Sequence, residues 1–100
     1  MTKYNKLVRD KIPEILNQKN ISYKKRIADD KEYKIELVKK LLEETNEFVE
    51  TPTEEELADV IEVIMALKKL DEYSNVEVVR NSKREERGGF EEKIILKGEK

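Results

Sequence analysis

The chain carries two acidic pairs whose spacing suits metal-dependent hydrolysis. Glu44 and Glu47 stand three residues apart in the segment EETNE, and Glu56 and Asp59 stand three apart in EELAD. On a helix this spacing places both carboxylates of a pair on one face, one turn apart. About eight residues separate the pairs, a length that joins two antiparallel helices and brings both acidic turns to the same end. We therefore expect four carboxylates to face one another.

Such a cluster is chemically informative because clustered carboxylates repel one another and are costly to bury unless a cation neutralises them. Oxygen ligands suit hard cations such as Mg²⁺ or Mn²⁺. The chain contains no His and no Cys, which excludes imidazole-bound zinc, thiolate metal sites and a Ser-His-Asp triad. Carboxylate, Lys, Arg, Tyr and hydroxyl chemistry is what remains.

The same acidic pairs have a plainer reading as solvated helix flanks, since 23 of the side chains are acidic and such pairs are then common. The three acids at 54–56 would also favour the dipole of a helix that starts there. Glu43, Glu44 and Glu47 lie near a predicted helix C-terminus, where negative charge is unfavourable. That conflict favours a functional site, although spacing alone leaves both readings open.

Two long amphipathic helices must position these acids. Apolar residues recur with helical period over 31–49, and Asp29 or Asp30 can cap the start of that helix. Residues 51–53 break it. A second helix follows to about residue 70, with Thr53 and Glu56 at the spacing of a capping box.

The second helix is apolar over roughly 220° of its wheel, wider than the ~100° stripe of a surface helix. One partner helix cannot cover that arc. We therefore expect a mainly α-helical, antiparallel bundle built on a central helical hairpin. We expect a second copy to complete it, giving a homo-oligomer that is a dimer or a dimer of dimers.

Shorter elements flank this hairpin. Pro13 fits the first turn of a short helix. Ser74 can cap a further helix, which the glycines at 88–89 end. Residues near 23–27 and 92–96 read as short strands able to pair with each other.

Composition limits the remaining possibilities. One hundred residues fit a single domain, 1–100. A net charge of -2 gives no general footprint for a nucleic-acid polymer or an anionic membrane. No apolar run approaches the ~20 residues of a membrane span, and the start lacks the apolar core of a signal peptide. We expect a cytoplasmic protein whose ligand is held by local charge.

The acidic segments also carry a family resemblance. EETNE followed by EELAD resembles the EExxE and ExxD signature of the all-α NTP pyrophosphohydrolase superfamily, the MazG-like and dUTPase-like helical enzymes. The opening YNKLVRDKIPEIL and the late KREERGGFEEKIIL are similar to the ends of a small MazG-like subgroup described as phosphoribosyl-ATP pyrophosphohydrolase-like. The likeness covers nearly the whole chain in order.

This resemblance implies an enzyme that hydrolyses nucleoside triphosphates to a nucleoside monophosphate and pyrophosphate, a reaction that cleans the nucleotide pool. It implies Mg²⁺ as cofactor, with Mn²⁺ as a possible substitute. The implied metal ligands are Glu44, Glu47, Glu56 and Asp59. The implied catalytic residues are Glu43, Glu44 and Glu47; Glu43 either orients a water on the metal or is simply solvated.

Basic residues are expected to contact the outer phosphates, since a triphosphate carries about four negative charges and the metal offsets only part of them. The candidates are Arg9 and Lys11 in VRDK, and Lys83, Arg84 and Arg87 in KREERGG. Each one singly reads more readily as an exposed charge paired with a nearby acid. Both groups lie at breaks in the helical pattern, where loops present functional side chains. Tyr4 and Asn5 could contact a base or ribose.

Two other functions stay open at this point. One is hydrolysis of a specialised nucleotide such as phosphoribosyl-ATP, because a subgroup label often records likeness of fold rather than substrate. The other is a non-catalytic helical module that binds a nucleotide or a protein partner, which would turn over no nucleotide.

Overall fold

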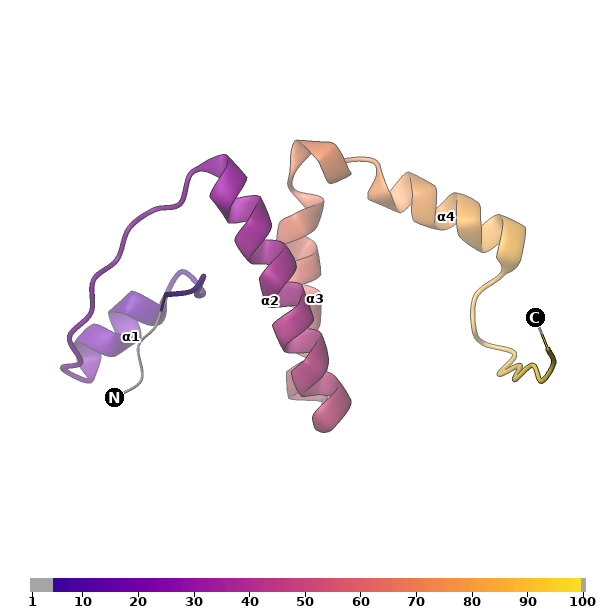
Figure 1. Cartoon of the computed structure of the whole chain (residues 1–100), viewed down its shortest axis with the longest axis horizontal. Helices are drawn as coiled ribbons and strands as arrows, with labels where there is room; N and C mark the ends of the chain where they lie inside the picture. The colour runs from indigo at the N-terminus through magenta and orange to yellow at the C-terminus, as the bar shows by residue number, and fades with distance from the viewer. Residues whose placement is uncertain (1–4, 100) are drawn as a thin grey trace.

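The computed structural model describes residues 5–99, and over that part of the chain the protein is mainly helical, as the periodicity predicts (Figure 1). Tyr4, which the sequence leaves open as a contact for a base or ribose, lies outside the described residues. The elements in chain order are α1 (Ile12–Gln18), α2 (Asp30–Glu50), α3 (Glu54–Lys68), the short 3₁₀ helix η1 (Asp71–Tyr73) and α4 (Val76–Arg87).

Several helix ends lie at residues whose side chains or backbone conformation favour them. Asp29 caps α2 by accepting a 2.8 Å hydrogen bond from the backbone nitrogen of Glu32. Pro13 lies in the first turn of α1. Gly88 ends α4 with a φ of 80°, a value that glycine adopts without strain. The prediction for Ser74 was wrong: Asn75 is the N-cap of α4, and its side chain makes no capping bond.

Helices α2 and α3 lie side by side, and the chain reverses direction between them (Figure 1). Leu37 of α2 and Val63 of α3 are the buried apolar residues among those described, at 3% and 8% exposure. Lys34, near the start of α2, donates a 2.6 Å bond to Glu72 of η1 and so ties the two segments together. This helix pair is the only substantial packing that one copy of the described chain provides.

The predicted pairing of residues 23–27 with 92–96 does not occur, and residues 5–99 contain no strand. The first segment belongs to the connection between α1 and α2, whereas the second belongs to the tail after α4, on the other side of the helix pair (Figure 1). Ile27 and Ile95 are 89% and 91% exposed. Local β-propensity was not enough because the helices between the segments hold them apart.

Both long helices carry a second apolar stripe that faces away from the partner helix and lies open to solvent. We call these stripes the outer apolar faces. On α2 the face comprises Ile35, Val38, Leu42 and Val49, and on α3 it comprises Leu57, Ile61, Ile64 and Met65. Leu37, the buried position of α2, lies 100° or more from each of the α2 residues of this face at 100° per residue.

The chain is more open than a compact monomer of its length. Its accessible surface is 9789 Å², whereas a compact monomer of this mass exposes about 5,900 Å². Its radius of gyration is 17.9 Å, against about 13 Å for a compact domain of this length. Within residues 5–99, every helix is too short or too polar to serve as a membrane span.

Candidate metal centre

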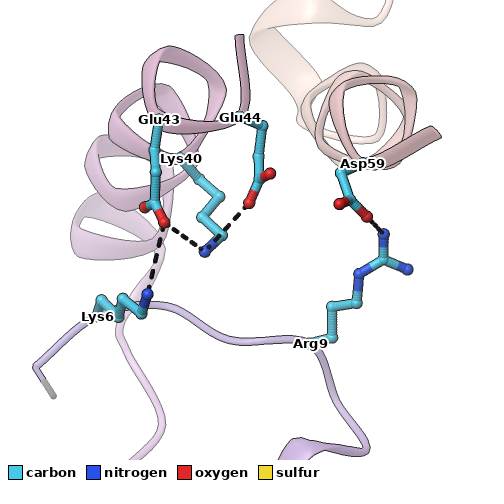
Figure 2. Close-up of polar contacts among 6 residues, drawn as sticks. All are labelled: Lys6, Arg9, Lys40, Glu43, Glu44 and Asp59. Atoms are coloured by element: carbon cyan, nitrogen blue, oxygen red, sulfur yellow. Dashed lines mark hydrogen bonds and ion pairs between the residues drawn. The ribbon is translucent and has the colours of Figure 1, made fainter. Parts of the chain in front are cut away.

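Three carboxylates meet where α2 approaches its end and α3 begins. Glu44 of α2 and Glu56 and Asp59 of α3 each present an oxygen, and the three oxygens lie within 4.8 Å of one another. The short connection at 51–53 produces this meeting, because it brings the last turns of α2 beside the first turns of α3. Glu44 and Asp59 are drawn in Figure 2, where their carboxylates extend from neighbouring helices.

Glu44 is the unusual member of this group because it is an acid in the small core. It is 8% exposed, and its Oε2 atom is buried with no hydrogen-bond partner. Burial raises the pKa of Glu44, a side-chain hydrogen bond with Glu47 and the charges of Glu47 and Asp59 raise that pKa further, and Lys40 lowers it. The charged form of Glu44 is therefore incompletely compensated by protein groups alone.

Glu56 is freed for the cluster by an incomplete capping box. Thr53 accepts a 3.3 Å hydrogen bond from the backbone nitrogen of Glu56, as the spacing predicts. The reciprocal bond of a capping box does not form, since the backbone nitrogen of Thr53 donates to the carbonyl of Thr51 at 2.8 Å. The Oε2 atom of Glu56 is buried without a hydrogen bond. Helix capping therefore explains the position of Thr53 but leaves the Glu56 carboxylate unexplained.

Glu47 was expected as a fourth ligand but does not join the group of three. It is exposed on α2, and a helix turns by 100° per residue, so Glu47 is rotated by 60° from Glu44. The two carboxylates are nevertheless close enough for Glu47 to raise the pKa of Glu44. The structure thus brings together three of the four expected ligands and leaves Glu47 beside them.

Glu43 points to a different set of partners. Its Oε1 atom lies 3.5 Å from the Nζ atoms of Lys6 and Lys40 (Figure 2). Lys40 also lies 3.5 Å from Oε1 of Glu44. Sequence reasoning missed Lys40, although its spacing of three and four residues from two acids of one helix was visible in the sequence. Lys40 therefore bridges a candidate ligand and a candidate catalytic acid.

The basic candidates are divided between two parts of the molecule. Arg9 reaches the cluster, since its Nη2 atom lies 2.7 Å from Oδ1 of Asp59 (Figure 2). Lys11 is exposed at the start of α1. The three residues of the second group, Lys83, Arg84 and Arg87, lie exposed on α4, and Arg84 bonds to Glu91 at 2.8 Å.

Within one copy, α4 cannot bring its basic residues to the acids. The acids stand at the start of α3, whereas α4 follows η1 at the other end of that helix. Fifteen residues of α3 span about 22 Å, and α4 then extends away from the helix pair (Figure 1). A phosphate-binding role for Lys83, Arg84 and Arg87 stays a prediction.

Comparisons with protein-family models, with curated proteins and with solved structures found no match for this chain. The case for function therefore rests on the site itself. Three oxygen donors converge, two of them have buried atoms without a hydrogen bond, and no nitrogen or sulfur donor of His or Cys exists in the chain. Glu44, Glu56 and Asp59 could hold a metal ion, and their chemistry fits a hard divalent cation.

Proposed function

We propose that this protein is a Mg²⁺-dependent nucleoside triphosphate pyrophosphohydrolase of the MazG-like all-α superfamily, acting in the cytoplasm on the nucleotide pool. The observation that carries the proposal is Glu44, a buried carboxylate with an unpartnered oxygen beside Glu56 and Asp59. A structural salt bridge would have satisfied that oxygen, whereas a divalent cation supplies the missing charge. The resemblance of EETNE and EELAD to the signature of that superfamily supports the family and the substrate class in this proposal.

The acidic side chains have different roles in this proposal. Glu44, Glu56 and Asp59 hold the cation, and Mg²⁺ there would neutralise phosphate oxygens and activate the attacking water. Glu47 lies beside this group on the exposed side, where it can accept a proton. Glu43 is held by Lys6 and Lys40, which makes it the weaker candidate for a base.

The reaction in this scheme is one displacement at the α-phosphorus of the triphosphate. The water oxygen forms a bond to that phosphorus, and the bond from the phosphorus to the oxygen bridging to the β-phosphate breaks. Pyrophosphate leaves with the bridging oxygen, and the Glu47 carboxylate takes the proton that the water loses. The products are a nucleoside monophosphate and pyrophosphate.

The proposal includes a second copy of the chain that completes an antiparallel bundle on the helical hairpin of α2 and α3. The outer apolar faces support it. Ile35, Val38, Leu42 and Val49 recur at spacings of three, four and seven, the heptad positions of a helix that packs against another helix. The excess exposed surface, about 3,900 Å² per copy relative to a compact monomer, exceeds the roughly 1,000–2,500 Å² that each copy of an obligate homodimer buries.

The decisive experiment is a panel of NTPs and dNTPs with Mg²⁺, scored by release of pyrophosphate. We expect turnover by the natural chain, and its loss in Glu44→Gln and Glu56→Gln with the helical circular-dichroism spectrum retained. Glu62→Gln, an exposed acid of α3 outside the cluster, is the matched control and should keep full activity. Phosphoribosyl-ATP belongs in the panel, because exclusive turnover of that compound would assign a specialised substrate. If no nucleotide in the panel releases pyrophosphate, the proposed hydrolase activity is refuted.

A binding measurement tests the metal centre without requiring turnover. A ligand that binds only the folded state stabilises it by mass action, so Mn²⁺ or Mg²⁺ should raise the melting temperature. At a concentration one hundred times the dissociation constant the gain is about 2.7 kcal/mol. The double variant Glu44→Gln, Glu56→Gln should gain nothing, and equal gains in both proteins would show that the ion binds elsewhere.

A further inference from the structure

The segment before α1 crosses the acidic cluster and places a cation on it. Arg9 and Asp59 are 50 residues apart in the chain, yet their side chains form a 2.7 Å ion pair (Figure 2). Both side chains keep substantial contact with water, at 56% and 40% exposure. Asp59 is one of the three converging carboxylates. The guanidinium of Arg9 therefore supplies positive charge to a group that the proposed function assigns to a metal ion.

The protein cations do not compensate the three acids evenly. Asp59 has Arg9 at 2.7 Å, whereas the ion pair of Glu44 within residues 5–99 is the longer 3.5 Å contact with Lys40. One oxygen of Glu44 and one of Glu56 are buried without any hydrogen bond. The buried carboxylate oxygens of Glu44 and Glu56 therefore have too little positive charge near them. The more exposed Asp59 is paired with Arg9, which belongs to an exposed segment of chain.

We propose that Arg9 exchanges partners: its guanidinium holds Asp59 in the metal-free site, and once a divalent cation occupied the site the guanidinium would be released to bind the phosphates of the substrate. This inference rests on the proposed function, because it needs both a cation and a polyphosphate ligand. It goes beyond that function in naming one residue, Arg9, and the order in which its two partners are used.

The exchange is favourable on electrostatic grounds. A divalent cation on Asp59 repels the guanidinium and removes the negative charge that held it. Breaking the ion pair costs little, because exposed pairs contribute about 0.2–1 kcal/mol. A polyphosphate then offers several negative oxygens, which a guanidinium contacts with two parallel hydrogen bonds. Arg9 therefore weakens cation binding when no phosphate is present. Once the cation is bound, Arg9 strengthens the binding of the polyphosphate.

The test is a titration of the full-length, metal-free protein with Mn²⁺ by calorimetry, with and without inorganic tripolyphosphate. We expect Arg9→Gln to bind Mn²⁺ more tightly than the natural chain by a factor of up to about five, the factor that corresponds to loss of an exposed ion pair. With Mn²⁺ bound, we expect Arg9→Gln to bind tripolyphosphate at least about tenfold more weakly, as for loss of a charge-assisted hydrogen bond.

Two further variants separate the alternatives. Lys19→Gln removes the same unit of charge at the end of α1 and controls for a general electrostatic effect, which salt screens over about 8 Å at physiological ionic strength. Arg9→Lys keeps the charge without the planar fork, and its Mn²⁺ affinity should lie between those of the natural chain and Arg9→Gln. A purely structural role for Arg9 would change both affinities in the same direction.

The outcomes distinguish the inference from the proposed function. If Mn²⁺ binds the natural chain but Arg9→Gln and Lys19→Gln have equal affinities for it, the partner exchange is wrong and the metal centre stands. If Mn²⁺ binds but tripolyphosphate affinity does not change in Arg9→Gln, Arg9 is not a phosphate ligand. If Mn²⁺ binds none of these proteins, the metal centre fails and the exchange fails with it.

Discussion

Thr53 accepts a hydrogen bond from the backbone nitrogen of Glu56, while the carboxylate of Glu56 leaves the cap and joins Glu44 and Asp59. In a complete capping box that carboxylate would bond back to the nitrogen of Thr53. The short turn at 51–53 satisfies this nitrogen with the carbonyl of Thr51 instead. One residue therefore begins α3 through its backbone and is available as a metal ligand through its side chain.

Thr53→Ala should destabilise the protein by about 1 kcal/mol, because the cap of α3 is lost. For a chain of this size that corresponds to a fall of roughly 4–8 °C in melting temperature. Thermal unfolding followed by circular dichroism measures it. Thr51→Ala is the control, since only the backbone of Thr51 takes part in the turn, and an equal fall in both variants would contradict the capping role.

Glu44→Gln should stabilise the metal-free protein at pH 7 and remove its stabilisation by Mn²⁺. The pKa of Glu44 is raised by burial and by Glu47, so the folded state disfavours the charge that the unfolded state carries freely. Removing the charge relieves this cost.

The stability difference between Glu44→Gln and the natural chain should depend on pH. Because the folded pKa is raised, the cost is present above that folded pKa. It diminishes as the pH falls toward the ordinary glutamate value of about 4.3, below which both states are protonated. Melting temperatures of the natural chain and Glu44→Gln, measured without metal, should converge over that range. A gap that stays constant with pH would show that the charge is not the cause.

Glu47→Gln should lower kcat by about 10² to 10⁴, the usual contribution of a general base, while Mn²⁺ stabilisation is kept. Glu43→Gln should change kcat by less than about tenfold, because the Glu43 carboxylate is paired with Lys6 and Lys40. Steady-state release of pyrophosphate measures both. The reverse ranking would make Glu43 the proton acceptor.

Ile61→Lys should dissociate the proposed dimer. Burying a side chain of this kind contributes about 2 kcal/mol, so the affinity between copies should fall at least about tenfold. Light scattering during gel filtration over a range of protein concentrations reports the mass. Glu62→Lys, the next residue but outside the outer apolar faces, should leave the mass unchanged; a natural chain that is monomeric at every concentration would refute the interface.

Glu77 links α4 to the end of α3 and should make that link sensitive to acid. Its carboxylate lies 2.8 Å from both Lys68 and Arg80, and these cations hold its pKa below the ordinary range. A lowered folded pKa contributes stability above the unfolded value, about 4.3, and this contribution is lost as the pH falls through the folded pKa. Hydrogen exchange of α4 should therefore accelerate in Glu77→Gln at pH 7 but not in Glu85→Gln.

The sequence by itself determined the helices and the acids they carry. Period, caps and breaks placed α2, α3 and the turn between them, because these depend on local steric and hydrogen-bonding preferences. The i,i+3 spacing singled out four acids, because a helix converts sequence distance into direction, and three of them, Glu44, Glu56 and Asp59, meet in the structure.

Only the tertiary structure decided which acids meet and which cations join them. Glu47 does not join the group of three, because the face of α2 that packs on α3 carries Glu44 instead. The spacing of acids along one helix does not specify which face packs. Arg9 lies 50 residues from Asp59, and the unpaired segments 23–27 and 92–96 are held apart by the helices between them. Such contacts depend on how whole elements pack, since long-range packing energy overrides local propensity.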